Sequence, residues 1–112
     1  MVITRYAIFE GVIRDGQTEA MHAFVNERLV PLWRQFACAE TVRVMFGVEQ
    51  DPNGPTIPMI LAISYADEAA MKAALDSPAR YTSRDLLPEL YDTYFEEVKL
   101  HHYVMDTQVF PN

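Results

Sequence analysis

Three histidines are the side chains of this sequence best suited to acid–base chemistry, because imidazole titrates near neutral pH. His101 and His102 are adjacent in a predicted strand, so their side chains point to opposite faces and cannot chelate one ion together. His102 shares a face with Val98 and Leu100, which predicts a place under the helices. A lone histidine there is either a hydrogen-bonded core residue or the polar group of an apolar pocket. In the second case His102 is the candidate catalytic residue.

The other two histidines are predicted to have structural places. His101 shares its face with Lys99 and Tyr103, on the side of the sheet away from the helices, and His22 lies at the edge of a helix. Glu19 and His22 have helical spacing, but a zinc site needs three or four ligands and no third is evident. We therefore expect no metal and no cofactor. The sequence has no glycine-rich phosphate loop and no nucleophile elbow.

Aromatic side chains near the predicted cleft between helices and sheet could line a pocket for a flat organic molecule. The walls are assigned to Phe9, Trp33 and Tyr65. Arg80, near the start of the last predicted helix, could meet an anionic group of the ligand. The alternatives are that these aromatic residues belong to an ordinary core and that Arg80 is a surface residue.

Composition limits the classes of function. The 112 residues suffice for one domain with one core, which we assign to residues 1–112. A formal net charge of −7, with nine dispersed Lys and Arg residues, argues against nucleic acid as a partner. We expect no membrane partner and a cytoplasmic location, because no apolar run approaches about 20 residues and no signal peptide is evident. The single cysteine, Cys38, has apolar neighbours, which predicts inert packing.

The elements that must position these side chains follow from hydrophobic periodicity and turn residues. Strands are predicted at residues 5–13, 41–49, 57–65 and 98–105, and helices at 18–36, 68–75 and 79–95. Thr18 and Asp67 are the predicted helix N-caps. Pro31 predicts a kink or break near Leu29. Pro88 predicts that the last helix restarts about one turn earlier, near residue 85.

This order of elements predicts an α+β, ferredoxin-like βαββαβ fold with a four-stranded antiparallel sheet and helices on one face only. The strand at 57–65 is apolar on both faces, with Leu61 and Ile63 on one and Ile60 and Ala62 on the other. The helices can cover only one of these faces. The other face therefore predicts a homodimer formed through the open side of the sheet.

Two segments resemble those of the dimeric α/β-barrel proteins, in particular the EthD-like ones. Asn26–Leu32 is similar to the family's helix segment that ends in a proline–leucine pair, and Ser64–Ala79 is similar to its stretch between the third strand and the last helix. The resemblance extends over residues 5–106 and implies a dimeric α/β barrel that processes a small molecule. The implied activity is that of a cofactor-independent cyclase, monooxygenase or related enzyme acting on an aromatic or polyketide-like compound. The alternative is a non-catalytic protein that binds a hydrophobic ligand.

The chain also departs from the family at residues that carry chemistry. The family's histidine before the proline is missing, and Leu29–Val30 occupies that region. Relatives that cyclise polyketides carry a histidine where this chain has Arg80, and their partner tyrosine would fall near Ala74, so that acid–base pair is not carried over. A haem role is not expected, because no histidine lies between His22 and His101.

Overall fold

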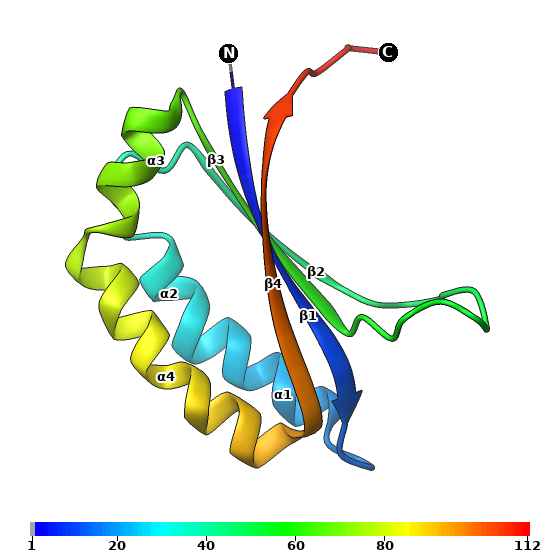
Figure 1. The fold of residues 1–112 in the computed structure, drawn as a ribbon. Helices are drawn as coiled ribbons and strands as arrows, with labels where there is room; N and C mark the ends of the chain where they lie inside the picture. The colour runs from blue at the N-terminus through cyan, green and yellow to red at the C-terminus, as the bar shows by residue number, and fades with distance from the viewer. Residues whose placement is uncertain (1) are drawn as a thin grey trace.

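A four-stranded antiparallel sheet with helices on one face only forms the molecule (Figure 1). The computed structural model describes residues 2–112. The strands are β1 Val2–Ile13, β2 Thr41–Phe46, β3 Met59–Tyr65 and β4 Phe95–Thr107, in the order β2-β3-β1-β4. The helical segments are α1 Thr18–Phe24, the π-helical turn Val25–Leu29, α2 Val30–Trp33, α3 Glu68–Leu75 and α4 Pro78–Tyr94. The predicted ferredoxin-like βαββαβ fold is confirmed.

The strand register divides the sheet residues between two faces. Ala7 of β1 lies opposite His102 of β4, and both face the helices. The next residue of β1, Ile8, lies opposite Ile60 of β3 and His101 of β4, so these three share the open face. The two adjacent histidines therefore point to opposite sides of the sheet, as the alternation predicts.

The hydrophobic core lies between the sheet and the helices. Its most deeply buried large side chains, each 0–1% exposed, are Phe9, Met21, Leu29, Met59, Tyr65 and Leu90. They come in about equal number from the two layers, so each layer covers the apolar face of the other. Burying a side chain of this size stabilises the fold by about 1.5–3 kcal/mol.

The predicted break before Pro31 is present as a change of helix type. The segment Val25–Leu29 forms a π-helical turn, and the chain then continues as α2. Proline has no N–H to donate to the preceding turn, and a wider turn accommodates the missing hydrogen bond. The predicted Thr18 N-cap is wrong. The cap lies one residue earlier, at Gln17, because the Met21 N–H donates to the Gln17 carbonyl at 2.9 Å.

The second pair of helices, α3 and α4, confirms one prediction and contradicts another. The Asp67 side chain caps α3, since its Oδ1 accepts a hydrogen bond from the Ala70 N–H at 2.8 Å. The predicted restart of α4 before Pro88 is wrong, because α4 runs without interruption. Pro88 and Arg84 are both exposed, so water can solvate the Arg84 carbonyl that loses its partner. None of the helices within residues 2–112 is long and apolar enough to span a membrane.

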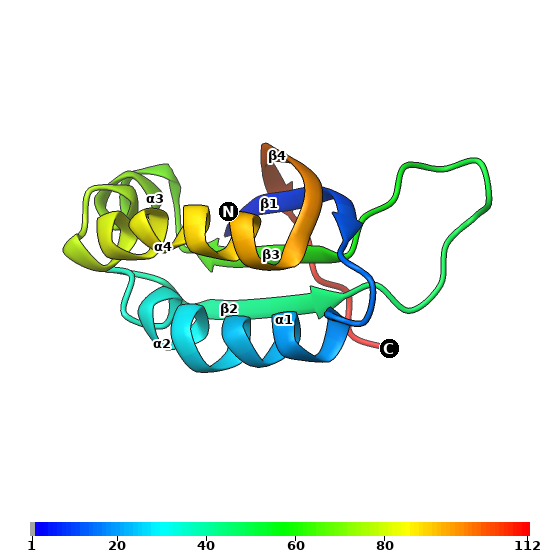
Figure 2. The ribbon, with the colours of Figure 1, turned by 90° about the horizontal axis from the view of Figure 1, so that it is seen from below.

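Each strand differs from its predicted bounds by two or three residues at one end or both, and β4 and β2 show the physical reasons. Strand β4 has 13 residues, because it pairs along nearly the whole of β1 and begins before the acidic Glu96 and Glu97, which hid its start. Strand β2 ends at Phe46, and the chain then enters a loop, 47–58, that extends away from the body of the molecule (Figure 2). Val48 in this loop is 98% exposed.

Cys38 is exposed, so the predicted burial of this side chain is wrong. It lies in the turn after α2 and adopts a left-handed backbone conformation, with φ of 62°. A turn residue in this conformation leaves the helix surface, which explains why apolar neighbours in the sequence did not bury it.

Candidate functional site

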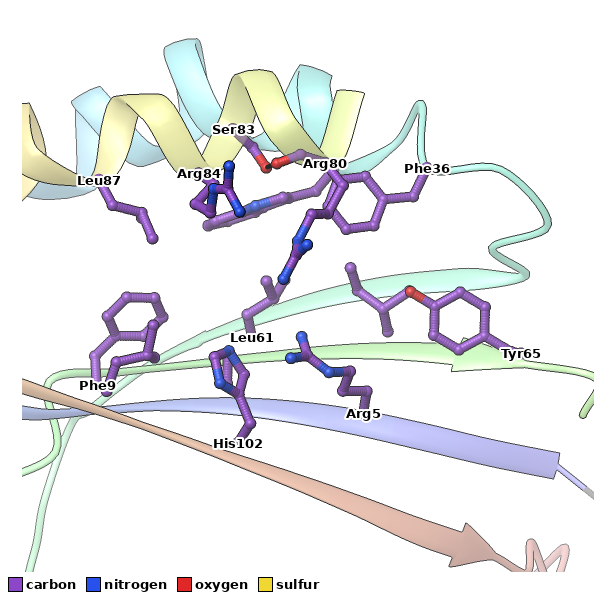
Figure 3. Close-up of a pocket in the computed structure, with 14 residues that line it drawn as sticks. Arg5, Phe9, Phe36, Leu61, Tyr65, Arg80, Ser83, Arg84, Leu87 and His102 are labelled. Atoms are coloured by element: carbon purple, nitrogen blue, oxygen red, sulfur yellow. Dashed lines mark hydrogen bonds between the residues drawn. The ribbon is translucent and has the colours of Figure 1, made fainter. Parts of the chain in front are cut away.

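A partly open cavity of about 190 Å³ lies between α4 and the helix-covered face of the sheet (Figure 3). All five site residues predicted from the sequence line this cavity, namely Phe9, Trp33, Tyr65, Arg80 and His102. They come from five different elements, in order β1, α2, β3, α4 and β4. The fold thus gathers them at one place, and their roles in binding or catalysis stay a prediction.

Most of the cavity wall is apolar. Besides the predicted aromatic residues, the apolar side chains that line it are Ala7, Phe36, Leu61, Ile63, Leu87 and Leu100. Its volume of about 190 Å³ is below the roughly 300–1,000 Å³ of sites for drug-sized ligands and close to the roughly 150 Å³ that encloses benzene. A molecule of about one ring therefore fits inside.

His102 lies at the mouth of the cavity rather than in a sealed core. Its side chain borders the cavity and is exposed in the single chain. Partial burial lowers the pKa of His102 below its ordinary value of 6.5, and the nearby positive charges of Arg5 and Arg80 lower the pKa further. The imidazole is therefore neutral at pH 7 and can accept a proton.

Arg5 is a cavity residue that the sequence analysis missed. It lies on β1 two residues before Ala7, so the strand alternation places it on the helix-covered face. Burial lowers the pKa of Arg5, and the positive charge of Arg80 acts in the same direction. The same alternation was visible in the sequence. An arginine near the beginning of an apolar strand is, however, typical of an exposed strand end.

Arg80 reaches the cavity from the first turns of α4. Its Nη1 donates a hydrogen bond at 3.2 Å to the carbonyl of Leu75, the last residue of α3. A helix C-terminus carries partial negative charge, which favours a guanidinium at this position. Figure 3 shows Arg80 extending from α4 toward the sheet, where Arg5 and His102 point toward it. Ser83, a further lining residue that was not predicted, is buried and donates to the Arg80 carbonyl at 2.8 Å.

Tyr65 closes one end of the cavity (Figure 3). Its side chain is 1% exposed. Burial raises the pKa of Tyr65 to about 12, and the positive charge of Arg5 opposes part of that shift. The phenol is therefore neutral at physiological pH and can donate a hydrogen bond to a ligand but not act as an anionic base.

The remaining histidines lie outside the cavity, as expected. The His22 ring stacks on Phe46 with 3.7 Å between ring centroids. On the open face, His101 Nε2 lies 2.9 Å from Glu10 Oε1. Within residues 2–112, no three or more His, Cys, Asp or Glu side chains are grouped so that they could hold a metal ion.

Comparison with known proteins identifies the fold. No family model and no curated protein matches the sequence. Among solved structures, the chain is similar to an EthD family protein from Bacillus halodurans, with 14% identity and a TM-score of 0.70 over 96% of this chain and 100% of that chain. It is also similar to SnoaB, a cofactor-independent oxygenase from Streptomyces nogalater, with 15% identity and a TM-score of 0.62 over 99% of this chain and 98% of that one.

A third similar structure is a dimeric protein of unknown function and ferredoxin-like fold from Bacteroides fragilis. It has 13% identity and a TM-score of 0.55, over 91% of this chain and 94% of that chain. The predicted resemblance is thus confirmed for the fold, which is that of EthD-like and related ferredoxin-like proteins. Identities this low define the architecture of the chain and leave its activity to be argued from the cavity.

Proposed function

We propose that this protein binds a small organic molecule in the cavity between α4 and the sheet and transforms it without a cofactor. The observation that carries the proposal is the placement of His102 beside Arg5 and Arg80 at the mouth of an apolar cavity. Burial and the two arginines also lower the pKa of His102, which favours the neutral imidazole that a base requires. The likeness to a cofactor-independent oxygenase supports small-molecule processing on this fold.

The chemistry best suited to these groups is proton abstraction next to a carbonyl. In the proposed step His102 takes a proton from carbon, and the electron pair of the broken C–H bond moves onto the carbonyl oxygen to form an enolate. Arg5 and Arg80 donate hydrogen bonds to this anion. The protonated His102 then returns the proton to another atom of the same molecule, so the net result is an isomerisation.

Proton abstraction can be tested without knowledge of the substrate. Purified protein is incubated in D₂O with a panel of one-ring ketones, keto acids and keto amides, and exchange of the C–H protons is followed by NMR. We expect faster exchange in at least one compound, and a loss of about 10²-fold or more in rate for His102→Gln. His22→Gln is the matched control, because His22 lies outside the cavity. Equal exchange rates in His102→Gln and the wild type would contradict the role of His102.

A binding or accessory protein is the second candidate. The predominantly apolar wall favours it, because burial of a ring alone supports affinity. In that case the compounds bind, none exchanges its protons, and His102→Gln changes affinity alone. Binding without exchange for every member of the panel would thus replace the enzyme by this second function.

We also propose a homodimer in which the open sheet faces of two copies meet. Exposed apolar side chains gather on that face, with Met45, Tyr103 and Met105 each 40–49% exposed. Exposed apolar side chains of this kind are typical of an interface, and a two-fold dimer pairs the same surface with itself. The Bacteroides fragilis protein of similar fold is described as dimeric, which supports a dimer for this fold.

A further inference from the structure

We infer that the cavity recognises a small aromatic carboxylate, with the carboxylate held by Arg5 and Arg80 and the ring held by the apolar wall. This inference rests on the proposed function and specifies its ligand class. The chain has a net charge of −7 and only nine basic residues, yet three of them, Arg5, Arg80 and Arg84, line this single cavity. No Asp or Glu is among the lining residues.

The positive charge of the cavity has no counterion within residues 2–112. The ion pairs of this part of the chain join Arg28 to Glu89 and His101 to Glu10, and neither lies at the cavity. The charges that act on His102 are those of Arg5 and Arg80, which are both positive. Partly buried like charges are unfavourable without a partner, so an anionic ligand would relieve their repulsion.

The guanidinium groups are placed to share one anion. Arg5 extends from β1 and Arg80 from α4, and Figure 3 shows them directed toward one another across the cavity. The hydrogen bond to the Leu75 carbonyl uses one nitrogen of Arg80, which leaves further N–H donors free. The planar donor fork of arginine matches the two oxygens of a carboxylate.

The apolar part of the cavity wall accommodates the ring of the ligand. Phe9, Trp33 and Leu61 present apolar surface on the same cavity, and the volume of about 190 Å³ accommodates about one ring. Arg84 is exposed at the rim, where its guanidinium carbon lies 5.1 Å from the centroid of the Tyr81 ring. Its positive charge adds to the attraction that Arg5 and Arg80 exert on an anion.

Matched acids and amides test the charge preference directly. The probes are benzoate against benzamide, phenylacetate against phenylacetamide and cinnamate against cinnamamide. Binding is followed by the fluorescence of Trp33, the only tryptophan of the chain, which lines the cavity and is 3% exposed. We expect at least one acid to bind about tenfold or more tightly than its amide at low salt. Its advantage should shrink in about 0.5 M NaCl, where charges are screened.

Variants identify the residues responsible. Arg80→Gln should weaken binding of the acid by about tenfold to a hundredfold and leave the amide nearly unchanged. Arg34→Gln is the matched control, because Arg34 is exposed and does not line this cavity. Arg5→Gln provides a second test should Arg80→Gln disturb folding, and circular dichroism checks the fold of each variant.

The outcomes separate this inference from the proposed function. Equal affinity for acids and amides would overturn the inference and leave a small-molecule cavity in place. Failure of every acid and every amide to bind would contradict both. A preference for acids that survives in Arg80→Gln and in Arg5→Gln alike would overturn the assignment of the two arginines.

Discussion

Burial and nearby positive charge together disfavour the protonated form of His102. Partial burial is the largest cause of its lowered pKa, and the charges of Arg5 and Arg80 lower the pKa further. The protonation of His102 therefore depends on both arginines. The same charges that keep the imidazole neutral would stabilise an anion formed or bound beside it.

Removal of one arginine should raise the pKa of His102. Arg80→Gln deletes a positive charge that disfavours the protonated imidazole, so the pKa moves back toward its ordinary value of 6.5. Titration of the His102 ring protons by NMR measures this shift. Arg34→Gln, which changes the net charge equally, should leave the His102 titration unchanged. A pKa of His102 that falls or stays the same in Arg80→Gln would show that this charge does not act on it.

His102 should also make stability depend on pH. Its folded-state pKa lies below 6.5, so the unfolded chain takes up the proton first as the pH falls. The free energy of unfolding should therefore decrease as the pH drops below about 6.5 and level off below the folded-state pKa. Urea unfolding from about pH 8 to pH 5 should show a shallower loss for His102→Gln than for the wild type. An equal or steeper loss in His102→Gln would contradict this account.

Neighbouring residues in the sequence predict the presence of helices and strands better than they predict where each one begins and ends. The break before Pro31 and the Asp67 cap follow from rules that involve a few adjacent residues, and both were predicted, although the sequence did not show that the break would be a π-helical turn. The start of β4 was not, because Glu96 and Glu97 are unfavourable in isolation and lie in the strand only through pairing with β1. The uninterrupted α4 depends on the solvent exposure of Pro88, which the sequence does not state.

The Asp67 cap should contribute measurably to stability. Asp67→Ala removes the acceptor of the Ala70 N–H, so the free energy of unfolding should fall by about 1 kcal/mol. Urea denaturation measures this loss, and Asp67→Asn, which keeps a capping oxygen, should restore most of it. Asp51→Ala, in the exposed loop 47–58, is the control and should stay within about 0.5 kcal/mol of the wild type.

Gly11 marks a close approach between two strands. A Cβ atom at this position would collide with the backbone carbonyl of Glu97 on β4, and backbone atoms cannot move aside as a flexible side chain can. Gly11→Ala should therefore lower the melting temperature by several degrees, as expected for a loss of roughly 1–3 kcal/mol. Gly54→Ala, in the open loop, is the matched control. Equal melting temperatures for the two variants would contradict the close approach.

In the whole molecule, one face of the sheet is covered by helices and borders the cavity, and the other face is open. The helix-covered face holds the cavity, and the five residues predicted to line it do so. Their positions could be predicted because strand alternation and helix order are readable from the sequence. Arg5 was missed although the same alternation places it on this face, whereas the size of the cavity was not readable, since it depends on how α4 lies over β1. The open face retains exposed apolar residues for which a second copy is the proposed cover.

Ile60→Glu should dissociate the proposed dimer. Ile60 lies on the open face opposite Ile8 and Met45, and a carboxylate there would be buried without a partner. Light scattering should show a dimer for the wild type and a monomer for Ile60→Glu. Val48→Glu, in a fully exposed loop position, should remain dimeric. Ala62 is a poorer test, because it is already 0% exposed within one chain and its substitution would disturb folding. A monomeric wild type would contradict the dimer.

The cavity between α4 and the sheet is the proposed functional site, and a small organic acid is its proposed ligand. An NMR titration of the labelled protein with the tightest-binding acid among benzoate, phenylacetate and cinnamate tests both proposals at once. We expect saturable shifts of the Trp33 indole N–H and the His102 ring, with the His22 ring unchanged. Saturable shifts confined to residues outside the cavity, or none at Trp33 and His102, would contradict both proposals.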